Sequence, residues 1–393
     1  MGPCELVLAG GQVLDPGTAI DGIADIGFRN GSVAGVGDLA TRRRLDVSDC
    51  LVIPGMIDFH AHVYRGGTAL GVDADTIARR SGTTTWVDAG SAGAGNLEGL
   101  REHVVAHVET RVLAFLHIAY PGIFAFSREV MVGESSDLRL LDPAACARAA
   151  LRHPDLVRGI KVRVGARTSG AHGLLPLQLA LEAAELAGLP LMCHVDEPPP
   201  RLEDAVALLR PGDVLTHCFR PAPNAPALPD GRVRDGVLAA RERGVTFDVG
   251  HGMGSFAFAT AEAMLAAGFA PDVISSDVHS LCVDGPAFDN LMTMSKLLEL
   301  GMPLTEIVRA VTATPARLLR RPDLGTFAAG AAGDATVLEV EEGQFTATDA
   351  AGAARTLRRR LRLRAMVIGG RLWHRTPCAQ SATPNSRVRL RSK

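Results

Sequence analysis

The sequence predicts an α/β fold, a (β/α)8 barrel of the TIM type with a small β-sandwich module formed by both chain ends. From residue 53 to about 320, apolar β-rich runs alternate with helical stretches, as in repeated βα units. Eight such runs fit this length, and eight βα units are what such a barrel needs. Before and after this region, short strand-like pieces are separated by turn residues.

The barrel elements can be placed by these runs in chain order. The expected strands are residues 52–60, 83–89, 112–119, 159–164, 189–195, 213–219, 245–250 and 272–278. Helices are expected at 97–109, 176–187, 202–209, 234–243, 259–267 and 303–320. Strands of a parallel sheet are buried on both faces, which explains why these runs are almost continuously apolar.

Four segments follow from the change of pattern along the chain. Residues 1–52 and 321–374 carry short strands and turns, and they are expected to form the two parts of the β-sandwich module. Residues 53–320 form the expected barrel. Residues 375–393 are rich in Ser, Pro and Arg without apolar periodicity, so a disordered tail is expected.

The composition limits the function classes. With 393 residues, 47% hydrophobic and 21% charged, the chain can bury a large core. Its formal net charge of -2 creates no general field for nucleic acid or anionic membranes, so small-molecule chemistry is favoured and neither partner is expected. The N-terminus has no basic and apolar leader pattern, and seven scattered cysteines do not suggest a disulfide framework. A cytoplasmic protein is expected.

The first expected barrel strand ends in two histidines, His60 and His62. Alternate residues of a strand point to the same face, so two imidazoles at the end of a buried strand can bind one ion. Taken alone, the pair is as compatible with chance as with a metal site, because His is common at strand ends.

Further donor residues recur at the ends of later strands. Lys161 interrupts the fourth apolar run, and His194 ends the fifth. His217 ends the sixth run, and Asp277 ends the eighth. Each residue alone would be read as a cap or a hydrogen-bonded core residue. All strands of a barrel deliver their carboxyl ends to one face, so together these residues predict a metal centre there.

This ordered set of donors resembles that of the amidohydrolase superfamily of metal-dependent hydrolases, over about residues 1–374. Its binuclear members use a His-x-His pair, a carboxylated lysine, two further histidines and an aspartate. The resemblance implies two divalent ions, with Zn²⁺ expected, although such sites also accept Mn²⁺, Fe²⁺ and Co²⁺. The buried ion would be held by His60, His62 and Asp277, the more exposed ion by His194 and His217, and N6-carboxylysine at Lys161 would bridge them.

The chemistry of this set is consistent with hydrolysis. Two cations would repel the ammonium of Lys161, but addition of CO₂ converts it into a bidentate anion that suits Zn²⁺. The alternative is a lysine that extends out of the strand toward water. Two adjacent metals lower the pKa of a bridging water and polarise a carbonyl oxygen. Asp277 is the expected catalytic residue, first as general base and then as general acid.

Three further runs narrow the resemblance to the dihydroorotase-like deacetylase subgroup. They are residues 83–94, 246–252 and 276–280. Dihydroorotases resemble His-x-His-x-Arg, whereas Tyr64 stands at the arginine position here. The resemblance therefore implies a deacetylase that cleaves the acyl ester or amide bond of small N-acyl or O-acyl carboxylic acids.

Five residues are expected to contact the substrate or a metal ligand. They are Arg163, His251, Tyr64, Ser91 and His279. Arg163 shares the face of Lys161 and would bind a carboxylate at two points, or alternatively pair with a neighbouring loop.

The other four contacts follow from position. The two glycines that flank His251 permit close approach to a ligand. Tyr64 and Ser91 follow the first two strands and would donate hydrogen bonds. His279 shares the face of Asp277 and would orient a ligand.

Other functions remain open at this point. His194 and Glu197 form a His-x-x-Glu sequence, which resembles that of mononuclear cytosine deaminases. A cyclic amide hydrolase of the dihydroorotase or hydantoinase type is a further alternative. A non-catalytic scaffold paralogue is least favoured, because all six ligand types are in place.

The Pro-rich loop 219–232 is expected to cover the site. Relatives often form oligomers, so a homo-oligomer is one expectation, although no apolar stripe marks an interface.

Overall fold

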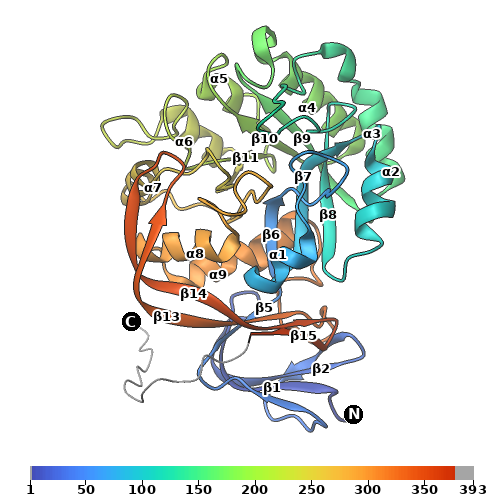
Figure 1. Cartoon of the computed structure of the whole chain (residues 1–393), viewed down its shortest axis with the longest axis vertical. Helices are drawn as coiled ribbons and strands as arrows, with labels where there is room; N and C mark the ends of the chain where they lie inside the picture. The colour runs from blue at the N-terminus through green and yellow to red at the C-terminus, as the bar shows by residue number, and fades with distance from the viewer. Residues whose placement is uncertain (1, 377–393) are drawn as a thin grey trace.

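The computed structural model describes residues 2–376 and contains two β-sheets (Figure 1). One sheet has eight strands and includes segments from both ends of the described chain, and the other has seven parallel strands. The expectation of a disordered tail at 375–393 falls, from residue 377 onward, outside the described residues.

The eight-stranded sheet joins distant parts of the chain, drawn in blue and red near the bottom of Figure 1. Its strands are β1 (Leu6–Asp15), β2 (Ile20–Arg29), β3 (Ser32–Val36), β4 (Arg44–Asp46), β5 (Leu51–Pro54), β13 (Ala335–Thr348), β14 (Ala354–Ile368) and β15 (Arg371–Arg375). Their order is β15-β14-β13-β5-β1-β2-β3, with β4 also paired to β1. The contact between the two chain ends is antiparallel, with Val337 of β13 opposite Val52 of β5. Both valines are buried in the apolar core of this sheet.

The seven-stranded parallel sheet follows the chain order, so each strand pairs with its sequence neighbour. Its strands are β6 (Met56–Ala61), β7 (Thr83–Gly93), β8 (Arg111–His117), β9 (Val157–Val164), β10 (Leu191–Val195), β11 (Val214–Thr216) and β12 (Thr246–Asp248). Beyond the last strand, Val273 bridges Asp248 of β12, and Val278 bridges Ala61 of β6. The sheet is therefore curled, because both of its edges reach the same segment.

The predicted strand 272–278 is wrong as a regular strand, since this segment forms only those two isolated parallel bridges. Its backbone instead bonds to a side chain of β6, where Asp58 Oδ1 accepts from the Ser276 N–H at 3.0 Å. Asp277 then adopts a left-handed conformation with φ 47°, which a continuous strand does not allow.

The predicted strand 52–60 is also wrong, because it divides at Gly55 into β5 and β6, which belong to different sheets. The Gly55 N–H donates to the Asp334 carbonyl at 2.9 Å. A Cβ at this glycine would lie 2.5 Å from Thr84 Oγ1, so no side chain fits at the crossing. Strands β11 and β12 are shorter than predicted.

The helices alternate with the parallel strands along most of the sheet. They are α1 (Ala74–Ser81), α2 (Leu97–Leu100), α3 (Pro143–Arg152), α4 (Leu175–Ala187), α5 (Leu202–Val206), α6 (Asp235–Glu242), α7 (Phe258–Ala266), α8 (Asn290–Glu299), α9 (Leu304–Val311) and α10 (Ala313–Leu318). Asp73 and Asp142 cap α1 and α3 by accepting from backbone N–H groups. Within residues 2–376, no helix combines the length and apolar character needed to cross a membrane.

Two predicted helices need correction. The predicted helix 97–109 consists of α2 followed by a π-helical turn, Arg101–Val105, and ends there. The predicted helix 303–320 breaks at Thr312, whose φ of -132° and ψ of -87° are not helical, so α9 and α10 are separate.

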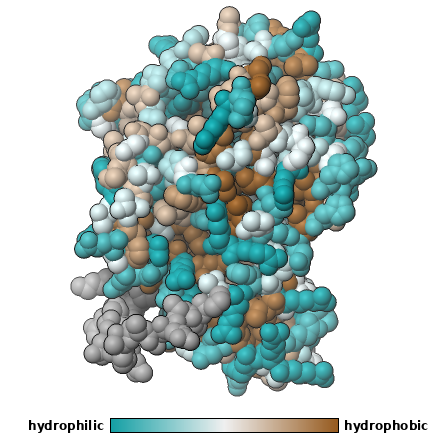
Figure 2. Space-filling model, in the orientation of Figure 1, coloured by the Kyte–Doolittle hydropathy of each residue, from teal (hydrophilic) through white to brown (hydrophobic). Residues whose placement is uncertain are grey.

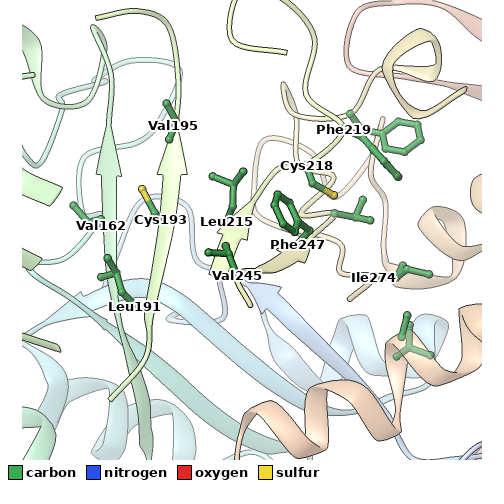
Figure 3. Packing of buried hydrophobic residues seen from close by; sticks show 14 of the residues in the cluster. Val162, Leu191, Cys193, Val195, Leu215, Cys218, Phe219, Val245, Phe247 and Ile274 are labelled. Carbon is green, nitrogen blue, oxygen red and sulfur yellow. The ribbon is translucent and has the colours of Figure 1, made fainter. Parts of the chain in front are cut away.

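Alternation along the parallel strands separates apolar packing from the polar interior. Val162, Cys193, Leu215 and Phe247 come from four neighbouring strands and belong to one buried apolar cluster that also contains helix residues (Figure 3). The residues next to them in sequence point to the opposite face of the sheet. The polar residues among these neighbours therefore lie on the inner face of the curled sheet.

Candidate active site

A cavity of about 200 Å³ lies where the parallel strands end. All six residues predicted as metal ligands line it, namely His60, His62, Lys161, His194, His217 and Asp277. Apolar side chains from loops also line it, among them Leu70, Ile123 and Phe126. On the face seen in Figure 2, apolar surface likewise gathers near the middle, between hydrophilic regions.

Three of these residues form a compact group of donors. Asp277 Oδ1 lies 3.4 Å from His60 Nε2 and 3.1 Å from His62 Nε2. The three ligand atoms all lie within 4.8 Å of one another, and all three residues are buried. Two imidazole nitrogens and a carboxylate oxygen at such spacing are ligands that Zn²⁺ and similar ions prefer.

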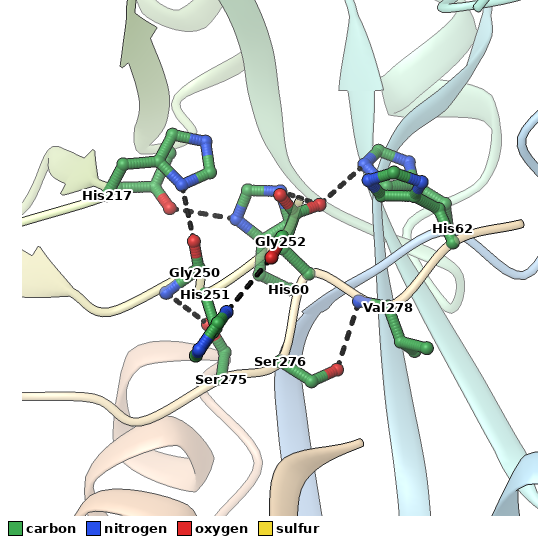
Figure 4. Close-up of polar contacts among 12 residues, drawn as sticks. His60, His62, His217, Gly250, His251, Gly252, Ser275, Ser276 and Val278 are labelled. Carbon is green, nitrogen blue, oxygen red and sulfur yellow. Dashed lines mark hydrogen bonds and ion pairs between the residues drawn. The ribbon is translucent and has the colours of Figure 1, made fainter. Parts of the chain in front are cut away.

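The Nδ1 atoms of His60 and His217 each have a hydrogen-bond partner in the protein. His60 Nδ1 lies 2.8 Å from Thr216 Oγ1, which in turn donates to Asp248 Oδ2 at 2.7 Å. His217 Nδ1 donates to the Gly250 carbonyl at 2.6 Å (Figure 4). In both rings the proton is therefore on Nδ1, so the Nε2 lone pair is free for a metal.

Ser91 gives the second histidine of the pair a similar partner. Its Oγ lies 2.9 Å from His62 Nδ1, and its backbone N–H donates to Asp88 Oδ1 at 2.8 Å. Ser91 is fully buried and does not line the cavity, so its role is to orient His62 rather than to contact the substrate as predicted.

Burial keeps the imidazoles of the site neutral. It lowers the pKa of His62 to about 3, and it lowers the pKa of His60, His194 and His217 well below 6.5. Burial also raises the pKa of the Asp277 carboxyl to about 6, against the effect of nearby His279 and Lys161. Neutral imidazole is the form that binds metals.

Two of the expected ligands have strained backbones. Asp277 has φ 47° and His217 has φ 68°, in the left-handed region that costs a non-glycine residue about 1–3 kcal/mol. The Asp277 N–H donates to the His60 carbonyl at 2.7 Å, which holds the two ligands together. Gly252 makes room for the carboxylate, because a Cβ there would lie 2.2 Å from Asp277 Oδ2.

Lys161 is buried without an ionic partner. The residue is 1% exposed, and its Nζ contacts Met192 Sδ at 3.4 Å. Among residues 2–376, no carboxylate forms an ion pair with it. Burial lowers the pKa of the amine to about 8. The alternative of a lysine extended toward water does not match this position.

Arg163 is paired with a loop, which was the alternative to a free carboxylate clamp. Its Nε donates to Glu134 Oε1 at 2.7 Å and its Nη2 donates to Oε2 at 3.1 Å. His117 Nε2 lies 3.2 Å from the same Oε1. Burial favours the neutral acid, but Arg163 and His117 outweigh it and lower the pKa of Glu134 to about 2. The guanidinium is therefore already neutralised in the cavity wall.

The remaining predicted contacts divide between the cavity and the protein interior. His279 lines the cavity, with its ring 6.1 Å from that of His62. Tyr64 is buried outside the lining and donates to the Asn96 carbonyl at 3.0 Å. The expectation that Tyr64 contacts the substrate is not supported by this position.

His251 is also placed away from the cavity. It is fully buried, its ring stacks on Phe256 at 4.6 Å, and its Nε2 accepts from Lys296 Nζ at 2.7 Å. The Lys296 ammonium also donates to the carbonyls of Pro286 and Thr348, so all three of its protons are used. This network fixes the turn that follows β12, including Gly250, rather than offering a substrate contact.

Glu197, the residue on which a deaminase mechanism depends, does not line the cavity. It accepts from Arg167 Nη2 at 2.6 Å and is partly exposed. Its neighbour Asp196 lines the cavity instead, as does Arg220 from the loop 219–232.

Sequence reasoning missed Asp248, Glu134 and Lys296. Asp248 lies in the run 246–252 that supports the family resemblance, and strand alternation places its side chain on the inner face of the sheet. Its role could therefore have been predicted from the sequence. Glu134 lies in a loop, and Lys296 lies in a helix with no distinctive pattern, so no signal identified either one.

Comparison with known proteins decides the family. Deacetylase Atu3266 of Agrobacterium fabrum is 33% identical over 344 residues, which span 86% of this chain and 84% of that protein. A deacetylase of Brucella anthropi is 32% identical over 345 residues, 87% of this chain and 85% of the relative. The model of the amidohydrolase family matches residues 225–372.

The chain belongs to the amidohydrolase family. Like other amidohydrolases, it is a metal-dependent hydrolase. A crystal structure of an adenine deaminase superimposes with a TM-score of 0.87 at 30% identity, covering 94% of this chain and 100% of that one. A crystal structure of a dihydroorotase gives a TM-score of 0.84 at 30% identity, covering 94% of this chain and 99% of that one. The amidohydrolase fold is thus shared with proteins of several different names.

Proposed function

We propose that this amidohydrolase is a deacetylase that cleaves the acyl ester or amide bond of small N-acyl or O-acyl carboxylic acids. The observation that carries the proposal is the buried group of His60, His62 and Asp277 at the cavity. The reaction type is supported by two relatives named deacetylase, whose matches span more than four fifths of both chains.

The proposal includes the architecture that presents the site. The curled parallel sheet is taken as a closed (β/α)8 barrel over residues 53–320, with segment 272–278 as its eighth member. Residues 1–52 and 321–374 then form the β-sandwich module. In this arrangement the carboxyl ends of the strands supply the catalytic residues.

The residues at the cavity fit two metal ions. His60, His62 and Asp277 would hold one ion, and His194 and His217 would hold the other. Lys161 would bridge both ions as N6-carboxylysine, since its buried amine has no ionic partner. Zn²⁺ is the proposed ion. When bound, such ions would polarise the scissile carbonyl and lower the pKa of a bound water.

Other residues of the chain have defined roles in this mechanism. The Asp277 carboxylate accepts a proton from the attacking water and returns it to the leaving oxygen or nitrogen. Ser91, Thr216 and the Gly250 carbonyl keep three imidazoles turned with Nε2 toward the cavity. Leu70, Ile123 and Phe126 form apolar wall and exclude water from the reacting bond.

A deaminase is the second candidate, favoured by the similarity to the adenine deaminase structure. It is ranked lower because Glu197, the proposed proton carrier, pairs with Arg167 outside the cavity lining. Cyclic amide hydrolysis ranks third, because the position of a dihydroorotase arginine is held by Tyr64.

The test is a library of acetylated amino acids and hydroxy acids, together with adenine and dihydroorotate. Acetate release is expected, without ammonia and without ring opening. Asp277→Asn should lower the rate at least about 100-fold, as the loss of a general base does. Ammonia from adenine without any acetate release would replace the deacetylase with a deaminase.

A further inference from the structure

Arg220 occupies an unusual place in the wall of the cavity. It follows the proposed ligand His217 by three residues, and its backbone N–H donates to the His217 carbonyl at 3.1 Å. Its side chain lines the cavity, yet the residue is only 8% exposed. A long cationic side chain is thus held inside the site rather than extended into water.

The guanidinium of Arg220 lacks partners. Its Nε and Nη1 are buried and have no hydrogen-bond acceptor, and within residues 2–376 it forms no ion pair. Asp196 and Glu197 are the acidic groups whose charges act on it. Burial lowers the pKa of Arg220 to about 10, which leaves it charged at neutral pH. A buried cation whose N–H donors have no acceptor destabilises the fold unless a bound ligand supplies the missing acceptors.

The other two arginines that line the cavity are already engaged. Arg163 makes two hydrogen bonds to Glu134. Arg167 pairs with Glu197, and its side chain is 71% exposed. Arg220 is therefore the cavity arginine, among the residues described, whose donors are still free.

Asp196 is an acidic residue of the same cavity, so its negative charge must be compatible with the binding of an anion. It lines the cavity, it is 7% exposed, and neither carboxylate oxygen has a hydrogen-bond partner. Its charge offsets that of Arg220 before a ligand enters. Its free oxygens can also accept from an N–H or O–H group of a ligand whose carboxylate reaches Arg220.

We infer that Arg220, rather than Arg163, binds the carboxylate of the substrate and so determines specificity for acylated acids. The identity of the substrate as an acylated acid rests on the proposed function. The binding of a carboxylate by Arg220 does not, because it can be measured separately. Guanidinium is suited to this role because its planar fork binds a carboxylate at two points.

The test compares one anion with its neutral isostere. Isovalerate and isovaleramide are used as inhibitors of 4-nitrophenyl acetate hydrolysis by the metal-loaded enzyme. The ratio of their inhibition constants measures the preference for the charged group within each variant. Arg220→Met should reduce the wild-type preference about 10- to 100-fold, the effect of losing hydrogen bonds to a charged group. Arg220→Lys, which keeps the charge, should retain part of it.

Arg167→Met is the matched control, because it removes another cavity arginine that is already paired and exposed. It should keep the wild-type preference. An unchanged preference in Arg220→Met, or equal losses in the two methionine variants, would overturn the assignment. If Arg220→Met shows no melting transition and is therefore not folded, Arg220→Lys and Arg220→Gln are compared with the wild type in its place.

Failure of the proposed function is distinguishable. If the wild-type enzyme hydrolyses neither 4-nitrophenyl acetate nor the acetylated acids, the deacetylase proposal fails. Calorimetric binding of isovalerate to the wild type and to Arg220→Met then decides the role of Arg220 alone. Equal dissociation constants would refute it, and a 10-fold or larger weakening would support it.

Discussion

Two parts of the proposed ligand set differ in how the protein holds them. His60, His62 and His217 each have an Nδ1 partner, and Asp277 is tied to His60 through the backbone. We call these four residues the oriented ligands. Among the residues described, the Lys161 amine has a methionine sulfur as its one hydrogen-bond partner, and the His194 ring makes no hydrogen bond. These two are the unoriented ligands.

The difference shows which part of the site the protein fixes by its own hydrogen bonds, without a bound ion. The three oriented histidines need no ion to keep their geometry, because a serine, a threonine and a backbone carbonyl already fix their rings. Asp277 is held by its backbone hydrogen bond to His60. Unoriented ligands depend on what binds between them. CO₂ on Lys161 and a metal near His194 would supply the missing interactions.

The largest expected effect comes from removing the bridge between the two parts. Lys161→Met keeps an apolar chain of similar length but cannot form a carbamate. We expect metal content to fall from about two ions per chain to one, and the rate of acetate release to fall at least about 100-fold, since metal polarisation contributes several kcal/mol. Elemental analysis of the purified variant and acetate assays measure both quantities.

One outcome would contradict the two-metal proposal directly. A Lys161→Met enzyme that retains full activity with one metal equivalent shows that no bridge is needed. Arg65→Met, which removes an exposed arginine paired with Asp73, is a control for loss of a positive charge and should keep both metals.

A smaller effect is expected when an oriented ligand loses its partner. Ser91→Ala removes the hydroxyl that lies 2.9 Å from His62 Nδ1, without touching a ligand atom. Metal affinity should weaken about 10- to 100-fold, as it does when such outer partners are lost. Competition with a chelator of known affinity measures it. Ser48→Ala, at an exposed serine, should bind metal like the wild type, and equal affinities in both variants would show that Ser91 does not orient His62.

The smallest effect concerns Glu134, the acid that is paired with Arg163. The pKa of Glu134 is lowered from 4.5 to about 2, so its carboxylate stabilises the fold fully above pH 4.5. That contribution is lost as the pH falls toward 2. Between pH 4.5 and 3 we expect the wild type to lose up to about 1.4 kcal/mol of unfolding free energy per pH unit more than Glu134→Gln.

Urea unfolding of metal-free protein at pH 5, 4 and 3 measures this difference without interference from metal release. Parallel declines in the two proteins would mean that Arg163 and His117 do not stabilise the Glu134 carboxylate. Glu134→Gln should also be the less stable protein at pH 7, because it leaves Arg163 without its ion pair.

The proposed ligands could be found in the sequence because they follow a rule of position. Five of the six lie in a parallel strand or directly after one, and Asp277 lies in the segment that bridges both edges of the sheet. Parallel strands deliver such residues to one edge, so His194 and His217 could be grouped despite their separation. The same reasoning fails for Arg220 and Glu134. Both lie in loops, where no periodicity shows which way a side chain points or which charge it meets.

The fold was predictable to a similar depth. Alternating apolar runs identified the parallel strands, but not the division at Gly55, which depends on contacts with Asp334 and Thr84 far along the chain. The irregular segment 272–278 was read as a strand because it is apolar. Its hydrogen bonds to the Asp58 side chain are a tertiary effect that no local pattern contains.

The pairing of β5 with β13 has a consequence for synthesis of the protein. Gly55 alone separates β5 from β6, the strand that carries His60, and β5 receives its antiparallel neighbour only when residues 335–338 arrive. At a translation rate of about 5–20 residues per second, that neighbour emerges on the order of 15–60 s after β5. During that interval one edge of β5 is open to wrong partners. The nascent chain therefore carries an open strand edge, which can pair with other chains, until residues 335–338 have been synthesised.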